Sequence, residues 1–199
     1  MNIWVFAEER SGSTWLCAEL ANKLNKPFVY LDSYHVCLGA IHQTHNFEVL
    51  QKGIDGIILR TTRKDSIEHM LSYIFLARMK VLNPEWWEFP HVWKDSIEAE
   101  ITFKKIIDEL NIEITENEVK DYIDLKKQRD KLWDAYSKPK QTIFYEDLHN
   151  GVDIPELNLS GITFRTGGKF KKLLWDKRSV IRNSDQASIW YENFTYGIK

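Results

Sequence analysis

The sequence predicts an α/β domain built on a central, mainly parallel sheet with helices packed against it. Short apolar runs alternate along the chain with longer stretches whose apolar residues recur at helical spacing. The first apolar run ends in a polar turn that leads directly into such a helix. With 199 residues, of which 43% are hydrophobic, the chain can bury one substantial core. We therefore predict one domain over residues 1–199, with a helical insertion or lid over residues 84–138.

The first strand, turn and helix form the most informative stretch. Residues 3–7 are an unbroken apolar run, residues 8–14 are polar with one glycine, and apolar residues then recur at helical spacing from Trp15 to Leu24. The first N–H groups of a helix have no intrahelical partner, and its dipole is positive there. A phosphate or sulfate is therefore well placed at the start of this helix.

The residues of this turn suit an anion. Gly12 allows a close approach of the backbone, the hydroxyl groups of Ser13 and Thr14 can donate hydrogen bonds, and Arg10 adds a positive charge. The alternative is an ordinary strand-to-helix turn in which Ser11 or Ser13 caps the helix. The turn lacks the lysine that a Walker A motif places beside its hydroxyl residue, so ATP with magnesium is not the first expectation.

Composition excludes several other classes of protein. The net charge of −2 provides no basic field for nucleic acid, and no apolar run approaches the roughly 18 residues of a membrane span. The start of the chain lacks the pattern of a secretory signal, so we expect a cytoplasmic protein. Cys17 and Cys37 form no Cys-x-x-Cys pair and are expected to be reduced core residues. We predict no metal site.

A second strand is predicted over residues 26–31, and Asp32 and His35 follow its end. The carboxyl ends of strands in an open α/β sheet line the ligand crevice, so either side chain could act as a general base there. Asp32 could equally cap a following helix, and His35 is the reserve base. His42 and His45 are expected on a surface loop, because no carboxylate or cysteine accompanies them as a metal partner.

A third strand is predicted over residues 54–60, followed by Arg63 and a helix that Asp65 can cap. Ser72 lies off the centre of the apolar stripe of this helix, so it could face a ligand together with Arg63. Arginine suits a phosphate dianion because its fork donates charge-assisted hydrogen bonds. The alternative is an arginine before an ordinary amphipathic helix, with a serine on its surface.

Residues 84–138 have a different character. The segment from Pro84 to Trp93 is rich in aromatic residues and proline and is predicted to be a loop or lid. Its tryptophans could stack on an acceptor or simply pack against the core. Helices are predicted over residues 94–110 and 116–136, and a fourth strand over residues 141–145.

Two of these motifs, in this order, resemble the nucleotide-binding motifs of the sulfotransferases that use 3′-phosphoadenylyl sulfate (PAPS). The run Arg10-Ser-Gly-Ser-Thr-Trp-Leu16 resembles their 5′-phosphosulfate loop, particularly in the bacterial branch that includes trehalose sulfotransferases. Arg63 and Ser72 resemble their 3′-phosphate site, and Tyr145-Glu-Asp-Leu148 resembles their Tyr-Glu-x-Leu motif. The resemblance implies a P-loop-type three-layer α/β/α fold with a central, mainly parallel sheet and a helical acceptor-side insertion.

The resemblance also implies roles for individual residues. Arg10 would both bind the donor and stabilise charge in catalysis, Asp32 or His35 would be the base, and a later segment would clamp the phosphates. The implied donor-binding residues are Arg10, Ser11, Gly12, Ser13, Thr14, Trp15, Arg63, Ser72, Arg165, Gly167 and Lys169.

The implied activity is transfer of a sulfuryl group from PAPS to a hydroxyl or amine acceptor, with 3′,5′-adenosine diphosphate (PAP) as product and no metal. The acceptor would be a small molecule or a carbohydrate, and a homodimer is one option for the assembly. The alternatives are a P-loop kinase of small metabolites that uses ATP and magnesium, and a nucleotide-binding module without catalysis. Glu8 and Glu9 directly precede Arg10, so we expect them to point away from the anion or to pair with Arg10 or a lysine.

Overall fold

The computed structural model describes residues 1–30, 37–82, 105, 110–163 and 177–197. The chain divides into two compact units, the first made of Met1–Asp65 with Lys127–Phe164 and the second of Ser66–Lys126 with Arg165–Lys199. Each unit is described separately below.

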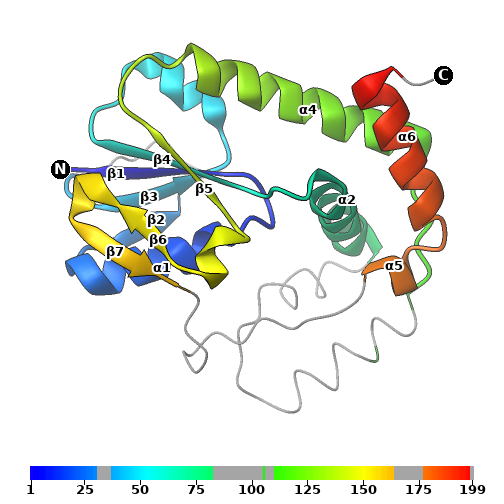
Figure 1. Ribbon diagram of the computed structural model, residues 1–199, viewed down its shortest axis with the longest axis horizontal. Helices are drawn as coiled ribbons and strands as arrows, with labels where there is room; N and C mark the ends of the chain where they lie inside the picture. Colours follow the sequence, from blue (N-terminus) through cyan, green and yellow to red (C-terminus); the bar gives the residue numbers. More distant parts are fainter. Residues whose placement is uncertain (31–36, 83–104, 106–109, 164–176, 198–199) are drawn as a thin grey trace. The chain divides into compact units, whose positions relative to one another are not determined.

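The first unit is built on a five-stranded sheet in which every pair of neighbouring strands is parallel. The strand order is β2-β3-β1-β4-β5, so the first strand of the chain lies in the centre (Figure 1). This arrangement confirms the predicted α/β class and the parallel sheet. The strands are β1 (Ile3–Ala7), β2 (Phe28–Tyr30), β3 (Ile41–Thr44), β4 (Ile57–Thr62) and β5 (Gln141–Phe144).

The apolar runs predicted four of these strands, with β4 beginning three residues later than expected. The sequence analysis missed β3 and instead placed His42 and His45 on a surface loop, which is wrong for His42. His42 is buried in β3 and stacks on Trp4, with 4.6 Å between the ring centroids. His45 directly follows β3 and is partly buried. A strand in the interior of a sheet normally has an apolar sequence, so Ile-His-Gln-Thr gave no recognisable signal.

Both faces of the sheet are covered within the first unit. Helix α1 (Ser13–Leu24) packs against β1, β2 and β3. The short 3₁₀ helix η1 (Phe47–Lys52) and the last turns of α4 (Glu116–Ala135) cover the opposite face (Figure 1). The core on this second face consists of Trp4, Phe6, Phe47, Leu50, Ile58, Trp133 and Tyr136.

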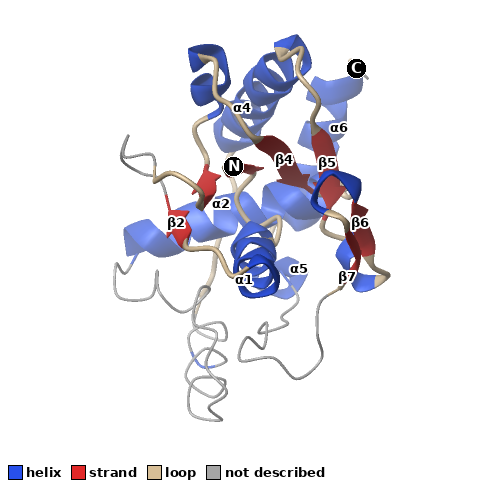
Figure 2. Ribbon diagram, turned by 90° about the vertical axis from the view of Figure 1, so that its left-hand side faces the viewer, coloured by secondary structure: helices blue, strands red, loops and turns tan. Residues whose placement is uncertain are grey.

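A small antiparallel hairpin, β6 (Val152–Ile154) and β7 (Leu159–Ile162), follows β5 along the chain (Figure 2). The 3₁₀ turn η3 (Asp147–His149) precedes β6, and the 3₁₀ turn η4 (Pro155–Leu157) connects β6 to β7. Gln141 Nε2 donates to the carbonyl oxygen of Asp153 at 2.8 Å, so the first residue of β5 contacts the hairpin.

The second unit has a helical core formed by α2 (Ser66–Leu82), the first half of α4, α5 (Lys177–Val180) and α6 (Ser184–Tyr196). The predicted apolar stripe of α2 is confirmed, since Met70, Leu71, Ile74 and Phe75 all lie in this core. The helix predicted over residues 116–136 is confirmed as α4, whereas most of the helix predicted over residues 94–110 lies outside the described residues.

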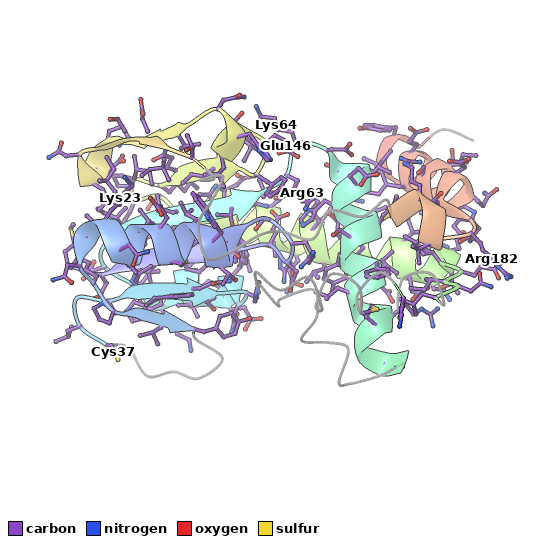
Figure 3. The ribbon with its side chains drawn as sticks, turned by 90° about the horizontal axis from the view of Figure 1, so that it is seen from below. Lys23, Cys37, Arg63, Lys64, Glu146 and Arg182 are labelled. Atoms are coloured by element: carbon purple, nitrogen blue, oxygen red, sulfur yellow. The ribbon has the colours of Figure 1, made fainter. Side chains whose placement is uncertain are left out.

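The two cysteines differ from each other. Cys17 is a buried core residue as predicted, and burial raises the pKa of its thiol. Cys37 is exposed, at the turn before β3, so its assignment to the core is wrong (Figure 3). Within the described part of the chain, no helix combines the length and the apolar character needed to span a membrane.

Replacing Phe6 by alanine tests the core on the η1 side of the sheet. Phe6 is fully buried and packs edge-on against Phe47, with 5.5 Å between ring centroids. We expect Phe6→Ala to lower the free energy of unfolding by about 3–5 kcal/mol in urea titrations. The control is Tyr196→Ala, since Tyr196 is 71% exposed and its loss should change stability by less than about 0.5 kcal/mol. Equal effects of the two substitutions would contradict this description of the core.

Candidate anion-binding site

The turn after β1 lies where the strand order of the sheet changes direction. β1 is paired with β3 on one side and β4 on the other, and α1 leads from its carboxyl end towards the β2 side of the sheet. Loops at the carboxyl ends of parallel strands on either side of such a point diverge and leave a crevice in which ligands bind. The turn over residues 8–12 therefore occupies the position at which this class of sheet normally binds a ligand.

The backbone of this turn has two left-handed residues, Arg10 with φ 66° and Gly12 with φ 78°. Glycine adopts this conformation without cost, whereas a side chain there is uncommon and strained by about 1–2 kcal/mol. Gly12 is the N-cap of α1, without a side-chain cap, and its carbonyl accepts the first helical bond from the Leu16 N–H at 3.1 Å. The start of α1 therefore presents backbone N–H groups and a positive dipole, as an anion site requires.

The alternative in which Ser11 or Ser13 caps α1 is wrong, because Gly12 is the cap. Both donors of Ser11 are used within the first unit. Its N–H donates to the Glu8 carbonyl at 3.2 Å, and its hydroxyl lies close to that carbonyl and 2.7 Å from Thr61 Oγ1. Ser11 is fully buried and fixes the turn to β4.

Gln43 of β3 contacts the start of α1 and was not found by the sequence analysis. Its Nε2 donates to Ser13 Oγ at 2.9 Å and to Thr14 Oγ1 at 3.3 Å. Ser13 is buried and Thr14 is exposed, so the two hydroxyls have different access to solvent. No motif marks Gln43, because its place beside α1 depends on pairing between strands distant in sequence.

Glu8 is held by side chains of β4. Its carboxylate is 2% exposed, pairs with Arg60 and accepts a hydrogen bond from Thr62 Oγ1 at 2.8 Å. Arg60 also pairs with Asp130 of α4 and lies over the ring of Phe47 at 5.4 Å. Burial lowers the pKa of Arg60, but the charges and hydrogen bonds of Glu8 and Asp130 outweigh burial and raise that pKa overall.

Glu9 is held by a bidentate ion pair with Arg129 of α4, with N···O distances of 2.6 and 2.8 Å. His45 lies nearby, 3.9 Å from Glu9, and its Nδ1 donates to the Ala7 carbonyl at 2.6 Å. Glu8 and Glu9 therefore pair with arginines distant in sequence and not with Arg10 or a lysine, which was one of the two alternatives expected for them. Their carboxylates are neutralised within the first unit and do not form a bare acidic patch beside α1.

Two arginines lie together at the turn. Arg63 Nε donates to the Arg10 carbonyl at 2.8 Å, and the Arg63 guanidinium lies 4.5 Å from the ring centroid of Tyr145. Burial and the positive charge of Arg63 lower the pKa of Arg10 to about 10, against the opposing effect of Tyr145. Burial likewise raises the pKa of Tyr145, which the charges of Arg63 and Arg10 partly offset. Mutual repulsion between two half-buried or buried cations is relieved by an anion placed next to both.

The Tyr145-Glu-Asp-Leu148 segment fixes the approach to Arg63. Glu146 accepts a hydrogen bond from the Lys64 N–H at 2.9 Å, and Lys64 Nζ pairs with Asp147. Arg63, Lys64 and Glu146 lie next to one another in Figure 3. Leu148 is fully buried. This segment therefore packs at the end of β5, and Tyr145 in addition contacts Arg63 directly.

The remaining predicted residues fall into two groups. Trp15 is 8% exposed in the first turn of α1, and Ser72 is 1% exposed within α2 of the second unit. The roles given to them in donor binding stay predictions. The other group, Asp32, His35, Arg165, Gly167 and Lys169, together with the lid tryptophans, lies outside the described residues.

No protein-family model matches the chain, and neither the curated proteins nor the solved structures searched include a significant match. The resemblance to sulfotransferases therefore depends on the motifs quoted above and on the geometry of the first unit.

The Glu9–Arg129 pair predicts how stability depends on pH. Burial raises the pKa of Glu9, but the hydrogen bond and charge of Arg129, with the charge of His45, lower it overall below its ordinary value of 4.5. A lowered folded-state pKa contributes stability that is present above pH 4.5 and is lost as the pH falls through the folded-state value. We expect Glu9→Gln to reduce the loss of stability in this acid range, measured by urea unfolding from neutral pH downwards.

The control for this measurement is Glu48→Gln, at an exposed position of η1. Its acid profile should follow that of the unmodified protein. A Glu9→Gln profile with the same acid slope as the control would contradict the role given to the Arg129 pair.

Proposed function

We propose that this protein is a sulfotransferase that uses PAPS as donor and a hydroxyl or amine compound as acceptor. The observation that carries the proposal is the convergence of Arg10 and Arg63 at the uncapped start of α1. This start lies at the carboxyl end of the central strand.

The chemistry of the turn supports a polyanionic ligand. Backbone N–H groups at a helix start bind phosphate and sulfate without a counter-ion, and arginine binds their oxygens through two parallel hydrogen bonds. Arg63 already uses Nε to hold the Arg10 carbonyl. Its two terminal nitrogens are the groups of the fork that would contact a phosphate.

The finer fold assignment belongs to the same proposal. A central parallel strand, a glycine-containing turn and a helix that starts with an anion site are the elements of a P-loop-type domain. Helical cover on both faces of the sheet is consistent with its three layers. The helical insertion on the acceptor side corresponds to residues 84–138, of which α4 is described.

The proposed reaction is an in-line transfer in which the chain positions the reactants and stabilises charge. The acceptor oxygen or nitrogen attacks sulfur and forms a new bond to it, and the bond from sulfur to the 5′-phosphate oxygen breaks. The proton of the acceptor passes to Asp32 or His35, and PAP leaves with the bonding electron pair. Arg10 and the N–H groups of Gly12, Ser13 and Thr14 would stabilise the charge that appears on the leaving phosphate.

Arg63→Ala tests the donor site. We expect the dissociation constant for 3′,5′-adenosine diphosphate, measured by calorimetric titration, to rise about 10- to 100-fold, because a charged hydrogen-bond donor is lost. 5′-AMP and magnesium-ATP should bind the unmodified protein more weakly than the 3′,5′-diphosphate. Arg63→Lys, which keeps the charge but not the fork, should show an intermediate effect.

Arg178→Ala is the matched control, because Arg178 is exposed and forms surface ion pairs with Glu68 and Asp185 in the second unit, both at 3.3 Å. Its affinity for the diphosphate should equal that of the unmodified protein. Tighter binding of magnesium-ATP than of the diphosphate would overturn the proposal in favour of a kinase. Binding of the diphosphate without any turnover of PAPS would indicate a module without catalysis.

Substitution of the two candidate bases tests which of them acts. If Asp32 is the base, Asp32→Asn lowers kcat for PAPS turnover by about 10²- to 10⁴-fold. The Michaelis constant for PAPS should change little, because the base contacts the acceptor. An unchanged kcat in Asp32→Asn with a comparable loss in His35→Asn would assign the role to His35 instead.

A further inference from the structure

Gln43 is a polar residue in the interior of the sheet. It lies in β3 opposite Val5 of β1 and is 1% exposed. Interior strands of parallel sheets are covered on both faces and consist mainly of apolar residues. A buried amide there lowers stability unless all of its hydrogen-bonding groups find partners.

One half of this amide has partners, and the other half has none among the residues that the structure describes. Nε2 donates to both Ser13 Oγ and Thr14 Oγ1, at 2.9 and 3.3 Å. Oε1 is buried, and no described residue donates a hydrogen bond to it. A buried acceptor without a partner costs more stability than a typical hydrogen bond contributes net. The amide is therefore poorly explained as a stabilising element of the fold.

The direction of the two hydrogen bonds has a chemical consequence. An amide N–H can only donate, so both hydroxyl oxygens accept from Gln43. Each hydroxyl has a single proton, and that proton is then directed away from the amide. Gln43 thereby turns two rotatable hydroxyls, next to the first N–H groups of α1, into donors of fixed direction.

We infer that Gln43 is a positioning residue that orients the Ser13 and Thr14 hydroxyls to donate to an oxyanion at the start of α1. The inference rests on the proposed function. It gives Gln43 a role in how the site recognises the sulfuryl and phosphoryl oxygens of the ligand. Oε1 of Gln43, which accepts no hydrogen bond from a described residue, supports this inference. An amide whose role is in ligand binding can lack some hydrogen-bond partners within the protein itself.

The test replaces Gln43 by methionine, which has a similar length and cannot donate a hydrogen bond. Affinities for sodium sulfate and for 3′,5′-adenosine diphosphate are measured by calorimetry, and the thermal midpoint is measured without ligand. We expect both affinities to fall about tenfold, since two oriented donors to a charged group are lost. The thermal midpoint should stay equal or rise, because a buried unsatisfied oxygen is removed.

Gln141→Met is the matched control. Gln141 lies in β5, and its Oε1 is likewise buried without a donor among the described residues, but its Nε2 bonds to the Asp153 carbonyl. Its replacement should leave both affinities unchanged. Gln43→Asn, which retains the amide on a shorter side chain, provides a second variant and should also weaken binding of both anions.

A double-mutant cycle tests whether Gln43 acts through the hydroxyls. In a Ser13→Ala/Thr14→Ala protein, adding Gln43→Met should cause no further loss of sulfate affinity. Additive losses would overturn the inference, as would a lowered thermal midpoint with unchanged affinities, which is the result expected of a purely structural residue.

The two probes separate this inference from the proposed function. If sulfate binds and depends on Gln43 while the 3′,5′-diphosphate does not bind, the inference stands and the choice of PAPS fails. If the diphosphate binds equally well with and without Gln43, the inference fails and the proposed function stands. If neither anion binds to the unmodified protein, both are wrong.

Discussion

The two acidic residues that follow β1 are held by arginines, and the shape of the candidate site depends on these pairs. Glu8 is anchored to Arg60 of β4, and Glu9 is anchored to Arg129 of α4. A buried carboxylate is costly unless it is paired and hydrogen-bonded, and both of these are. The pairs fix the two residues immediately before Arg10, so the left-handed turn at Arg10 and Gly12 starts from a rigid backbone.

The same pairs divide the charges of the turn between two sides of the sheet. Arg60 and Arg129 lie against Phe47, on the face covered by η1 and α4, and keep the carboxylates there. Ser13 and Thr14 are contacted by Gln43, whose partners belong to α1. One short segment can therefore contain two acids and still present a positively polarised helix start. The favourable electrostatics come from where each charge is paired and not from the net charge of −2.

Local patterns predicted most of the fold. Apolar runs identified β1, β2, β4 and β5, the 3.6-residue period identified α1 and α2, and a helix was also predicted at the position of α4. They missed β3, because His42 and Gln43 stand at its centre. Each of these residues is compensated from elsewhere, His42 by stacking on Trp4 and Gln43 by the hydroxyls of α1. Such compensation depends on tertiary contacts that a window of sequence does not contain.

The candidate site was predictable to a similar extent. Arg10, Gly12, Ser13 and Thr14 could be picked out because they lie in a strand, a turn and a helix that are contiguous in sequence, an arrangement that favours anion binding. The partners of Glu8 and Glu9 were not found, since Arg60 and Arg129 are 52 and 120 residues away. Ion pairs between such distant residues depend on the strand order and on where α4 meets the sheet, and neither follows from local spacing.

The central claim is that an oxyanion of the nucleotide binds to the backbone at the start of α1. A ¹⁵N–¹H correlation spectrum recorded during titration with 3′,5′-adenosine diphosphate tests it directly. Amide protons that begin to donate to an anion move downfield, so the account predicts the largest such shifts at Gly12, Ser13 and Thr14. A titration that saturates while these three amides stay in place would contradict it.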